Sequence, residues 1–251
     1  MTGATPQPEP VTFRELLARA WSMYRTEPWL FIALAAVTVI PVGILRAIAT
    51  GAATETPSAG RAVAIILIAV IPALLLLPVS GAAVSVAVLR RLVGDRVGVG
   101  ASLERVGLRF WILFAALVLV TLGVLVGLFA LVIPGIFLAI LWLFTGQVVV
   151  IEGKGITDAL RRSQDLVRGS WWTVFVAYLL ITVVTAMAQI ILGIIGTLVF
   201  LPLDGALAST AVGIWSTLTQ LIVEPFMLIA IALLYADRCI RHDGSLPTLE
   251  S

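Results

Sequence analysis

The sequence has almost none of the residues from which metal and disulfide sites are built. Among its 251 residues there is one cysteine, Cys239, and one histidine, His242. A lone cysteine cannot form an internal disulfide, and no His/Cys cluster with the spacing of a metal site is available. We therefore expect no metal and no cofactor. Cys239 also has no neighbouring base of note, which predicts an inert thiol.

Charged residues are scarce as well. They make up 12% of the chain against 61% hydrophobic residues, with a mean hydropathy of +1.13, whereas soluble proteins have about 25% charged residues. The ranges 62–89, 110–151 and 169–203 contain no Asp, Glu, Lys or Arg, and each exceeds the ~20 residues that span a bilayer. They are apolar at every phase, which excludes a membrane β-barrel. The fold class predicted is all-α, a polytopic membrane helix bundle.

The same scarcity argues against catalysis and nucleic-acid binding. No histidine accompanies a serine or cysteine in a plausible nucleophilic site, and no paired carboxylates recur at fixed spacing. The net charge of +2 comes from arginines that flank apolar segments rather than forming a basic stripe. The N-terminus lacks the pattern of a cleavable signal, so we expect the first span to be retained. We expect neither an enzyme nor a nucleic-acid partner.

The uncharged run 110–151 is long enough for two helices. It divides at 133–135, Ile-Pro-Gly, because Pro cannot continue a helix and Gly accepts turn geometry. One membrane domain is expected over 12–244, between a disordered tail at 1–11 and a C-terminal tail at 245–251. Its six predicted transmembrane helices form three hairpins, with spans at about 29–50, 62–89, 110–132, 135–152, 171–198 and 209–236.

An amphipathic segment precedes each hairpin. Thr12 and Glu15 have the spacing of a capping box at the start of the first. In 156–167 one helical face has the pattern i, i+3, i+4, i+7 and i+11, formed by Ile156, Ala159, Leu160, Ser163 and Val167. A weaker version lies at 99–110. Such helices are typical of the membrane interface, and we expect all three there. Tryptophans that mark the headgroup level as spans begin are Trp29, Trp111, Trp171 and Trp172.

Segments of the sequence that are far apart also resemble one another. A shift of 143 residues superimposes 13–29 on 156–172, with Trp29 falling on Trp172, and 99–111 is a shorter third copy. Two explanations stay open, which are true duplication and the general need of hairpin proteins for a basic interfacial helix before a tryptophan. Three hairpins of two spans each enter the membrane with the same orientation, unlike the inverted repeats of many transporters.

The distribution of basic residues predicts the topology. Of the sixteen Lys and Arg residues, all except Arg46 and Arg61 fall in the even-numbered loops or near the termini. By the positive-inside rule that side is the cytoplasm. We therefore expect both termini in the cytoplasm.

Glu224 is the one acidic residue inside a predicted span, and an ionisable group there is a default candidate for function. At about 1.5 Å of rise per residue, Glu224 lies roughly 20 Å from the inner boundary, in the outer half of the bilayer. Arg46, Gln189 and Gln220 fall at similar depth. A polar intramembrane cluster of these four residues would bind a lipid headgroup or polar solute. The alternative is that Arg46 snorkels to phosphate and Glu224 is protonated or bonded locally.

Two further features have structural explanations beside functional ones. Gly123 and Gly127 form a small-xxx-small face, which favours close helix packing over a binding site. The charged faces at 14–25 and 158–168 would dock a partner or anionic lipid, or simply be solvated.

Several motifs resemble a known family. They are Ile-Pro-Gly-Ile-Phe-Leu-Ala at 133–139, Val-Val-Val-Ile-Glu-Gly-Lys-Gly at 148–155, Ala-Leu-Arg-Arg-Ser at 159–163, Leu-Val-Arg-Gly at 166–169, Trp-Trp at 171–172 and Leu-Leu-Tyr-Ala-Asp-Arg at 233–238. Together they resemble the bacterial membrane domain family named for glycerophosphoryl diester phosphodiesterase. The resemblance covers about 100–247 and implies a prokaryotic multi-pass membrane domain of mostly unknown role. The name comes from fusions to a soluble phosphodiesterase, and no catalytic domain follows here, so that activity is not expected.

Two functions follow as hypotheses. The first is a non-enzymatic domain of the bacterial inner membrane that organises lipids or partners, the partners being membrane lipids, another protein or a second copy. The alternative is a transporter or permease for a small polar or lipid-derived solute, with its site between spans.

Overall fold

The computed structural model describes residues 12–51, 76, 78–203 and 205–247, and in these ranges every regular element is a helix. The all-α prediction is confirmed for them. Helices long and apolar enough to cross a membrane agree with membrane insertion, and the second predicted span, 62–89, lies mostly outside the described residues. The five candidates within the described ranges are Pro28–Ala47, Phe110–Ala130, Val132–Ile151, Trp171–Val199 and Leu207–Asp243.

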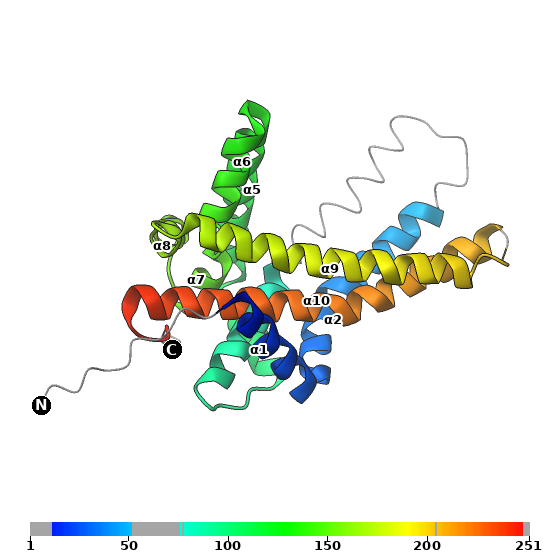
Figure 1. Ribbon diagram of the computed structural model, residues 1–251, viewed down its shortest axis with the longest axis horizontal. Helices are drawn as coiled ribbons and strands as arrows, with labels where there is room; N and C mark the ends of the chain where they lie inside the picture. The colour runs from blue at the N-terminus through cyan, green and yellow to red at the C-terminus, as the bar shows by residue number, and fades with distance from the viewer. Residues whose placement is uncertain (1–11, 52–75, 77, 204, 248–251) are drawn as a thin grey trace, which may run out of the picture.

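Two long antiparallel helices form the main axis of the molecule. They are α9 (Trp171–Val199) and α10 (Gly205–Asp243), and α2 (Pro28–Gly51) packs along α10 (Figure 1). Gly205 opens α10 at a positive φ of 58°, a conformation that glycine adopts without steric cost. α10 also contains Pro225, and α2 contains Pro41. The predicted first, fifth and sixth spans correspond to these three helices.

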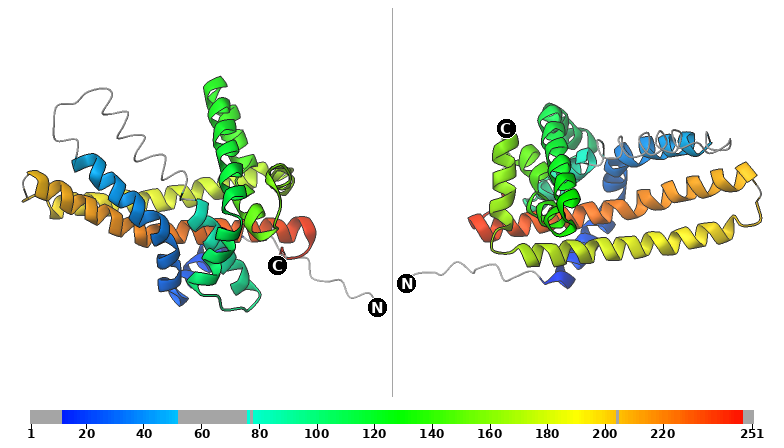
Figure 2. Two further views of the ribbon diagram at one scale, coloured as in Figure 1. Left: turned by 180° about the vertical axis from the view of Figure 1, so that it is seen from behind. Right: turned by 90° about the horizontal axis from the view of Figure 1, so that it is seen from above.

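A second hairpin stands across this axis. It consists of α5 (Phe110–Ala130) and α6 (Val132–Leu141), which pack on each other and point away from α9 and α10 in both Figure 1 and the view from above in Figure 2. The described part of the chain therefore does not confirm the predicted layout of six spans as three like-oriented hairpins. A break after Leu141 gives the physical reason, because it lets α6 leave the direction of α7 (Thr145–Ile151).

The turn between α5 and α6 falls earlier than the sequence predicts. Leu131 is the extended residue, with φ −166° and ψ 144°, and Pro134 lies inside the first turn of α6. Pro is tolerated there because the first N–H groups of a helix have no intrahelical partner. Gly135 serves close packing instead, since a Cβ at this position would lie 2.4 Å from Leu128 Cγ. The predicted fourth span, 135–152, is likewise interrupted at 142–144.

The amphipathic helices form as predicted, but their apolar faces are covered by protein. The capping box of α1 (Phe13–Thr26) is confirmed, with Thr12 N donating to Glu15 Oε2 at 3.0 Å. Ala20 of α1 is fully buried where this helix contacts α10, and Ala159 of α8 (Ile156–Val167) is fully buried too. α4 (Val99–Leu108) is the third such helix. α1 packs mainly on α10, α8 mainly on α7, and α4 on α2 and α5. The location of these helices at the membrane interface stays a prediction.

Burial is concentrated in one part of the bundle. The helical segment 78–92, α7 and the C-terminal half of α10 supply most of the core, and within them 82–84 and 148–151 are almost entirely inaccessible. The far halves of α9 and α10 expose large apolar side chains such as Ile190, Ile194 and Leu218. Such exposure suits contact with lipid, and it agrees with membrane insertion.

Candidate functional site

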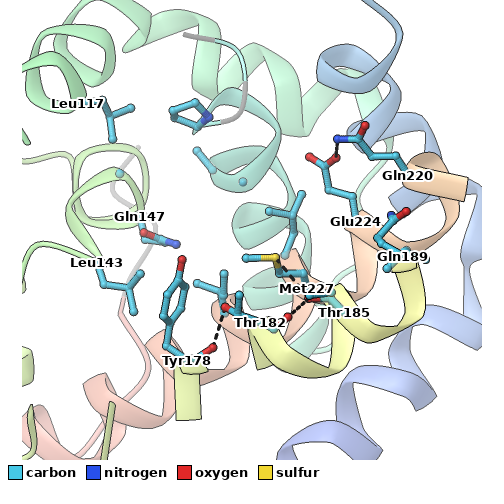
Figure 3. Close-up of a pocket in the computed structure, with 18 residues that line it drawn as sticks. Leu117, Leu143, Gln147, Tyr178, Thr182, Thr185, Gln189, Gln220, Glu224 and Met227 are labelled. Atoms are coloured by element: carbon cyan, nitrogen blue, oxygen red, sulfur yellow. Dashed lines mark hydrogen bonds between the residues drawn. The ribbon is translucent and has the colours of Figure 1, made fainter. Parts of the chain in front are cut away.

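A cavity of about 450 Å³ lies between the long helices and the core. α9 and α10 supply most of its wall, and the segment 78–92, α5 and α7 complete it. Figure 3 shows Gln189, Gln220 and Glu224 at one end, and Leu117 and Leu143 at the other, with Gln147 between these two leucines. The cavity is therefore amphipathic, and we call it the Glu224 cavity.

Glu224 is the most consequential of its lining residues. Its side chain is 8% exposed, and its Oε2 accepts a hydrogen bond of 3.1 Å from Gln220 Nε2, one turn earlier on α10. Its other oxygen, Oε1, is buried and has no hydrogen-bond partner among the described residues. A buried acceptor without a donor costs about 1–3 kcal/mol, more when it is charged. The cavity thus contains one unused hydrogen-bonding position.

The structure brings three of the four predicted cluster residues to this cavity. Gln189, Gln220 and Glu224 all line it, and Gln189 Nε2 also donates to Thr219 O at 3.4 Å. Arg46 attracts Glu224 electrostatically from the neighbouring α2. Counting the rise along the helices predicted that the four residues lie at a similar depth. The side chains of Gln189, Gln220 and Glu224 do meet at the cavity. Whether the cluster binds anything stays a prediction.

Other polar residues of the cavity were missed by sequence reasoning. Gln147 is 9% exposed on the short helix α7, and Thr182 and Thr185 face the cavity from α9. The two threonine hydroxyls donate to carbonyls of their own helix, at 2.9 Å each, so they need no ligand. Gln147 could have been singled out from the sequence, because it is a primary amide in the uncharged run 110–151. The direction in which the two threonines point depends on how α9 packs.

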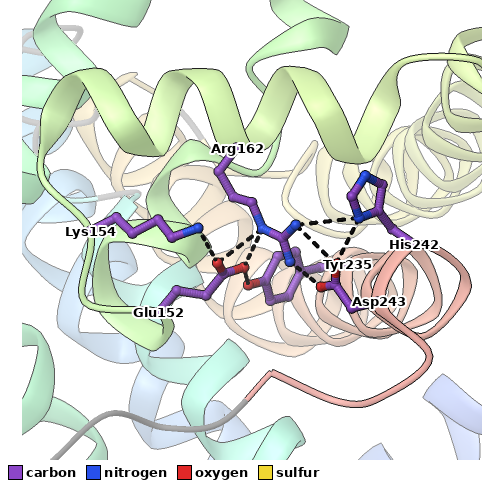
Figure 4. Close-up of polar contacts among 6 residues, drawn as sticks. All are labelled: Glu152, Lys154, Arg162, Tyr235, His242 and Asp243. Carbon is purple, nitrogen blue, oxygen red and sulfur yellow. Dashed lines mark hydrogen bonds and ion pairs between the residues drawn. The ribbon is translucent and has the colours of Figure 1, made fainter.

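A second polar group joins α8, α10 and the chain after α7. It consists of Glu152, Lys154, Arg162, Tyr235, His242 and Asp243, and we call it the Glu152 cluster (Figure 4).

Both oxygens of Glu152 are fully partnered. Tyr235 donates to Oε1 at 2.8 Å, Arg162 Nε lies 3.0 Å from Oε2, and Lys154 Nζ lies 3.0 Å from Oε2. Arg162 also donates to Asp243, which bonds His242 in turn. The hydrogen bond to Asp243, together with the Glu152 carboxylate, raises the pKa of the Arg162 guanidinium above its ordinary value. With donors and acceptors matched, the cluster leaves no vacant position for a ligand.

The Glu152 cluster was not predicted as a site. Four of its six members belong to motif runs quoted above, at 148–155, 159–163 and 233–238, whereas His242 and Asp243 follow the last run. Nothing in the sequence pairs positions 152 and 235. Their contact spans 83 residues of chain. The structure thus gives these runs a common role, which is to hold α8 and the end of α10 against the core.

Neighbouring hydrogen bonds close the break between α6 and α7. Ser163 Oγ accepts from Phe144 N at 3.2 Å and donates to Leu141 O at 2.9 Å. Arg105 Nε donates to Val150 O at 3.2 Å, at the end of α7. Buried backbone groups need such partners, so α8 and α4 make the interrupted helix possible.

The two glycines predicted to serve helix packing, Gly123 and Gly127, both lie at close contacts. A Cβ at Gly123 would lie 2.5 Å from the Trp142 ring, and one at Gly127 would lie 2.9 Å from Gly135 Cα, so both glycines sit at close helix contacts.

The four tryptophans divide by exposure. Trp29, Trp111 and Trp172 are 81%, 77% and 72% exposed, whereas Trp171 stacks on Phe175 and donates to Phe137 O at 3.3 Å. Their interfacial role stays a prediction.

Comparisons with known proteins give a family but no activity. No group of three or more His, Cys, Asp or Glu side chains that could hold a metal ion lies in the described ranges. In comparisons with curated proteins and with solved structures nothing matches. A family described as a domain of unknown function, DUF7847, matches residues 13–237, nearly the whole length of the chain. The chain therefore belongs to the DUF7847 family.

Proposed function

We propose that this chain is a membrane protein that binds a small polar or lipid-derived solute between its helices, as a transporter or permease does. The Glu224 cavity is the site. The observation that carries the proposal is that Glu224 lines a cavity of about 450 Å³ and that its buried Oε1 has no hydrogen-bond partner among the described residues. Cavities of roughly 300–1,000 Å³ with a few polar groups are typical of small-molecule sites.

The chemistry of the cavity describes its solute. Glu224 Oε1 calls for a hydrogen-bond donor, and Gln189 and Gln220 supply amides beside it. The opposite wall has the apolar side chains of Leu117 and Leu143 and one amide, Gln147. A molecule with hydroxyl or ammonium groups at one end and a short alkyl segment at the other matches both. This is the chemistry of a lipid-derived solute.

The test uses 1-monooctanoylglycerol, which has two hydroxyl donors and a short alkyl chain. Purified protein in mild detergent is titrated with it, and thermal unfolding is followed. A ligand that binds only the folded state at 100 times its Kd stabilises by about 2.7 kcal/mol. We expect a rise in unfolding temperature that Glu224→Gln diminishes and Glu224→Leu abolishes. Methyl octanoate, which lacks donors, should produce no rise.

Glu104→Gln is the matched control, since this exposed acidic residue lies on α4 away from the cavity. It should behave as the unaltered protein. Equal stabilisation of the unaltered protein and Glu224→Leu would contradict the proposal. Native mass spectrometry of the same samples reports retained molecules and oligomeric state together.

The second candidate function is a non-enzymatic domain that organises lipids or a partner protein. It is favoured by the tip of the α5–α6 hairpin, where Phe129, Leu131 and Ile133 are 90%, 69% and 80% exposed. If the purified protein retains only phospholipids, to the same extent with and without Glu224, this function replaces the first. On neither hypothesis does the chain act as an enzyme, and the resemblance to the phosphodiesterase-associated domain stays a prediction that carries no activity.

We also propose the finer topology, with six spans as three hairpins in the bacterial inner membrane and both termini in the cytoplasm. The bias of Lys and Arg, of which only Arg46 and Arg61 fall on the other side, supports it. The sole cysteine, Cys239, is buried, so single cysteines introduced at Ser245 and Ile133 can be probed with an impermeant maleimide in intact cells. Labelling of Ser245→Cys from outside would overturn the orientation.

A further inference from the structure

A second cavity, of about 390 Å³, lies where α1, α9 and α10 meet (Figure 1). Its residues are separate from those of the Glu224 cavity. Phe13 and Leu16 come from α1, Val176 and Leu180 from α9, and Arg238 from α10. We call it the Arg238 groove. Its walls are mainly apolar, and its one cationic side chain stands at the end of α10 that bears the charged residues.

Arg238 is buried to an unusual degree for an arginine. The residue is 8% exposed, and its Nε is buried without a hydrogen-bond partner among the described residues. Its Nη2 lies 3.1 Å from Asp237 Oδ2. Arginines are almost never buried unless they are fully paired. A buried N–H without an acceptor costs about 1–3 kcal/mol, so Arg238, which lines the groove, has one unused donor.

The charge around this donor favours an anion. Asp237, which also lines the groove, is shared by two arginines, since Arg241 Nε lies 2.8 Å from the same Oδ2. The group of Asp237, Arg238 and Arg241 therefore has one positive charge in excess. Arginine binds phosphate oxygens with charge-assisted hydrogen bonds about twice as strong as neutral ones. Thr173, on the first turn of α9, adds a hydroxyl to the same wall.

The apolar walls indicate what accompanies the anion. Val176 and Leu180 line the groove, and beyond them α9 exposes Val183, Val184 and Met187 in the direction of its apolar far half. Trp172, at the rim, is 72% exposed, as is typical of residues at headgroup level. We propose that the Arg238 groove binds a phosphate ester anion, supplied by a phospholipid whose headgroup meets Arg238 and whose acyl chain follows α9.

The proposal is independent of the Glu224 cavity and would stand if that site bound nothing. The experiment titrates the purified full chain in mild detergent with dihexanoylphosphatidylglycerol, dihexanoylglycerol or inorganic phosphate, and measures bound ligand by native mass spectrometry. We expect the phospholipid to bind. Dihexanoylglycerol, which lacks phosphate, and inorganic phosphate, which lacks acyl chains, should each bind at least about tenfold more weakly.

Arg238→Met keeps the aliphatic volume and removes the donor, and it should weaken phospholipid binding by about tenfold or more. Arg161→Met is the matched control, because this exposed arginine lies on α8 and does not line the groove, and it should retain binding. If Arg238→Met does not fold, Leu180→Trp fills the groove and should reduce binding equally.

Three results would overturn the proposal. They are unchanged binding in both Arg238→Met and Leu180→Trp, equal binding of dihexanoylglycerol, and equal binding of inorganic phosphate, which would assign the anion site to free phosphate.

Discussion

Glu152 and Glu224 are both buried carboxylates among apolar helices, and their surroundings are opposite. The Glu152 side chain is 10% exposed, and Arg162, Lys154 and Tyr235 occupy both of its oxygens. Glu224 has one oxygen bonded to Gln220, and its other oxygen has no hydrogen-bond partner in the described part of the chain. A fully matched buried network fixes a fold, whereas a half-matched one is destabilising unless something else completes it. The first carboxylate thus stabilises the fold, and the second is the one that we propose binds a ligand.

The largest expected effect comes from removing the arginine of the Glu152 cluster. Arg162→Met should lower the free energy of unfolding by about 3–5 kcal/mol, because it removes the ion pairs of Arg162 with both Glu152 and Asp243, and hydrogen bonds to charged groups contribute about 1.5–3 kcal/mol each. Thermal or denaturant unfolding in detergent measures it. Arg161→Met, the exposed neighbour on the same helix, should change stability by no more than about 0.5 kcal/mol. If both variants unfolded alike, the cluster would have no structural role.

A matched pair of isosteric changes tests the two carboxylates directly. Glu152→Gln removes the charge that pairs with Arg162 and Lys154, and should cost about 3 kcal/mol. Glu224→Gln keeps an acceptor for Gln220 and should change stability by less than about 0.5 kcal/mol. Denaturant unfolding of both variants in one detergent is the measurement. Equal losses would mean that Glu224 is a structural residue like Glu152.

Tyr235→Phe removes one neutral donor from the same cluster. Hydrogen bonds to charged groups contribute about 1.5–3 kcal/mol, so we expect a loss in that range. Tyr178→Phe is the control, since Tyr178 lines the Glu224 cavity and should lose less than about 0.5 kcal/mol. The ratio of the two losses, read from thermal unfolding, would sharpen the contrast between partnered and open regions.

The smallest change within the partnered region is Ser163→Ala. It deprives Phe144 N of its acceptor at the break between α6 and α7, and should cost about 1 kcal/mol. Ser102→Ala is a suitable control because the Ser102 hydroxyl is also buried but donates only to Gly98 O on its own helix turn, at 3.2 Å. Hydrogen exchange at 142–145 should rise in the first variant alone.

Local features of the fold were accessible from the sequence, and long-range ones were not. The capping box of α1 depends on residues three apart, and the apolar stripes of α1 and α8 on helical period, so both were predictable. The turn at Leu131 was misplaced because Pro134 suits a helix start as well as a helix end. The break after Leu141 depends on Ser163, 22 residues further on.

The candidate site divides in the same way. Glu224 could be singled out as the one acidic residue within a span, and counting helix rise placed Gln189 and Gln220 beside it. Gln147 reaches the cavity because α7 packs between the other helices, which no local pattern encodes. The pairing of Glu152 with Tyr235 likewise requires the closed fold. Arg238 could not be singled out from the sequence, because it lies among other basic residues at the end of a span.

The proline that follows Glu224 gives α10 an uneven stiffness. Pro225 has no N–H to donate to the carbonyl of Leu221, so one backbone hydrogen bond of the helix is missing next to Glu224. On one side the helix is anchored by Tyr235 and Asp243, and on the other it runs outward with Gln220. The 39-residue helix therefore bends most easily next to the residue that faces the cavity. Bending there would alter the cavity without disturbing the anchored end.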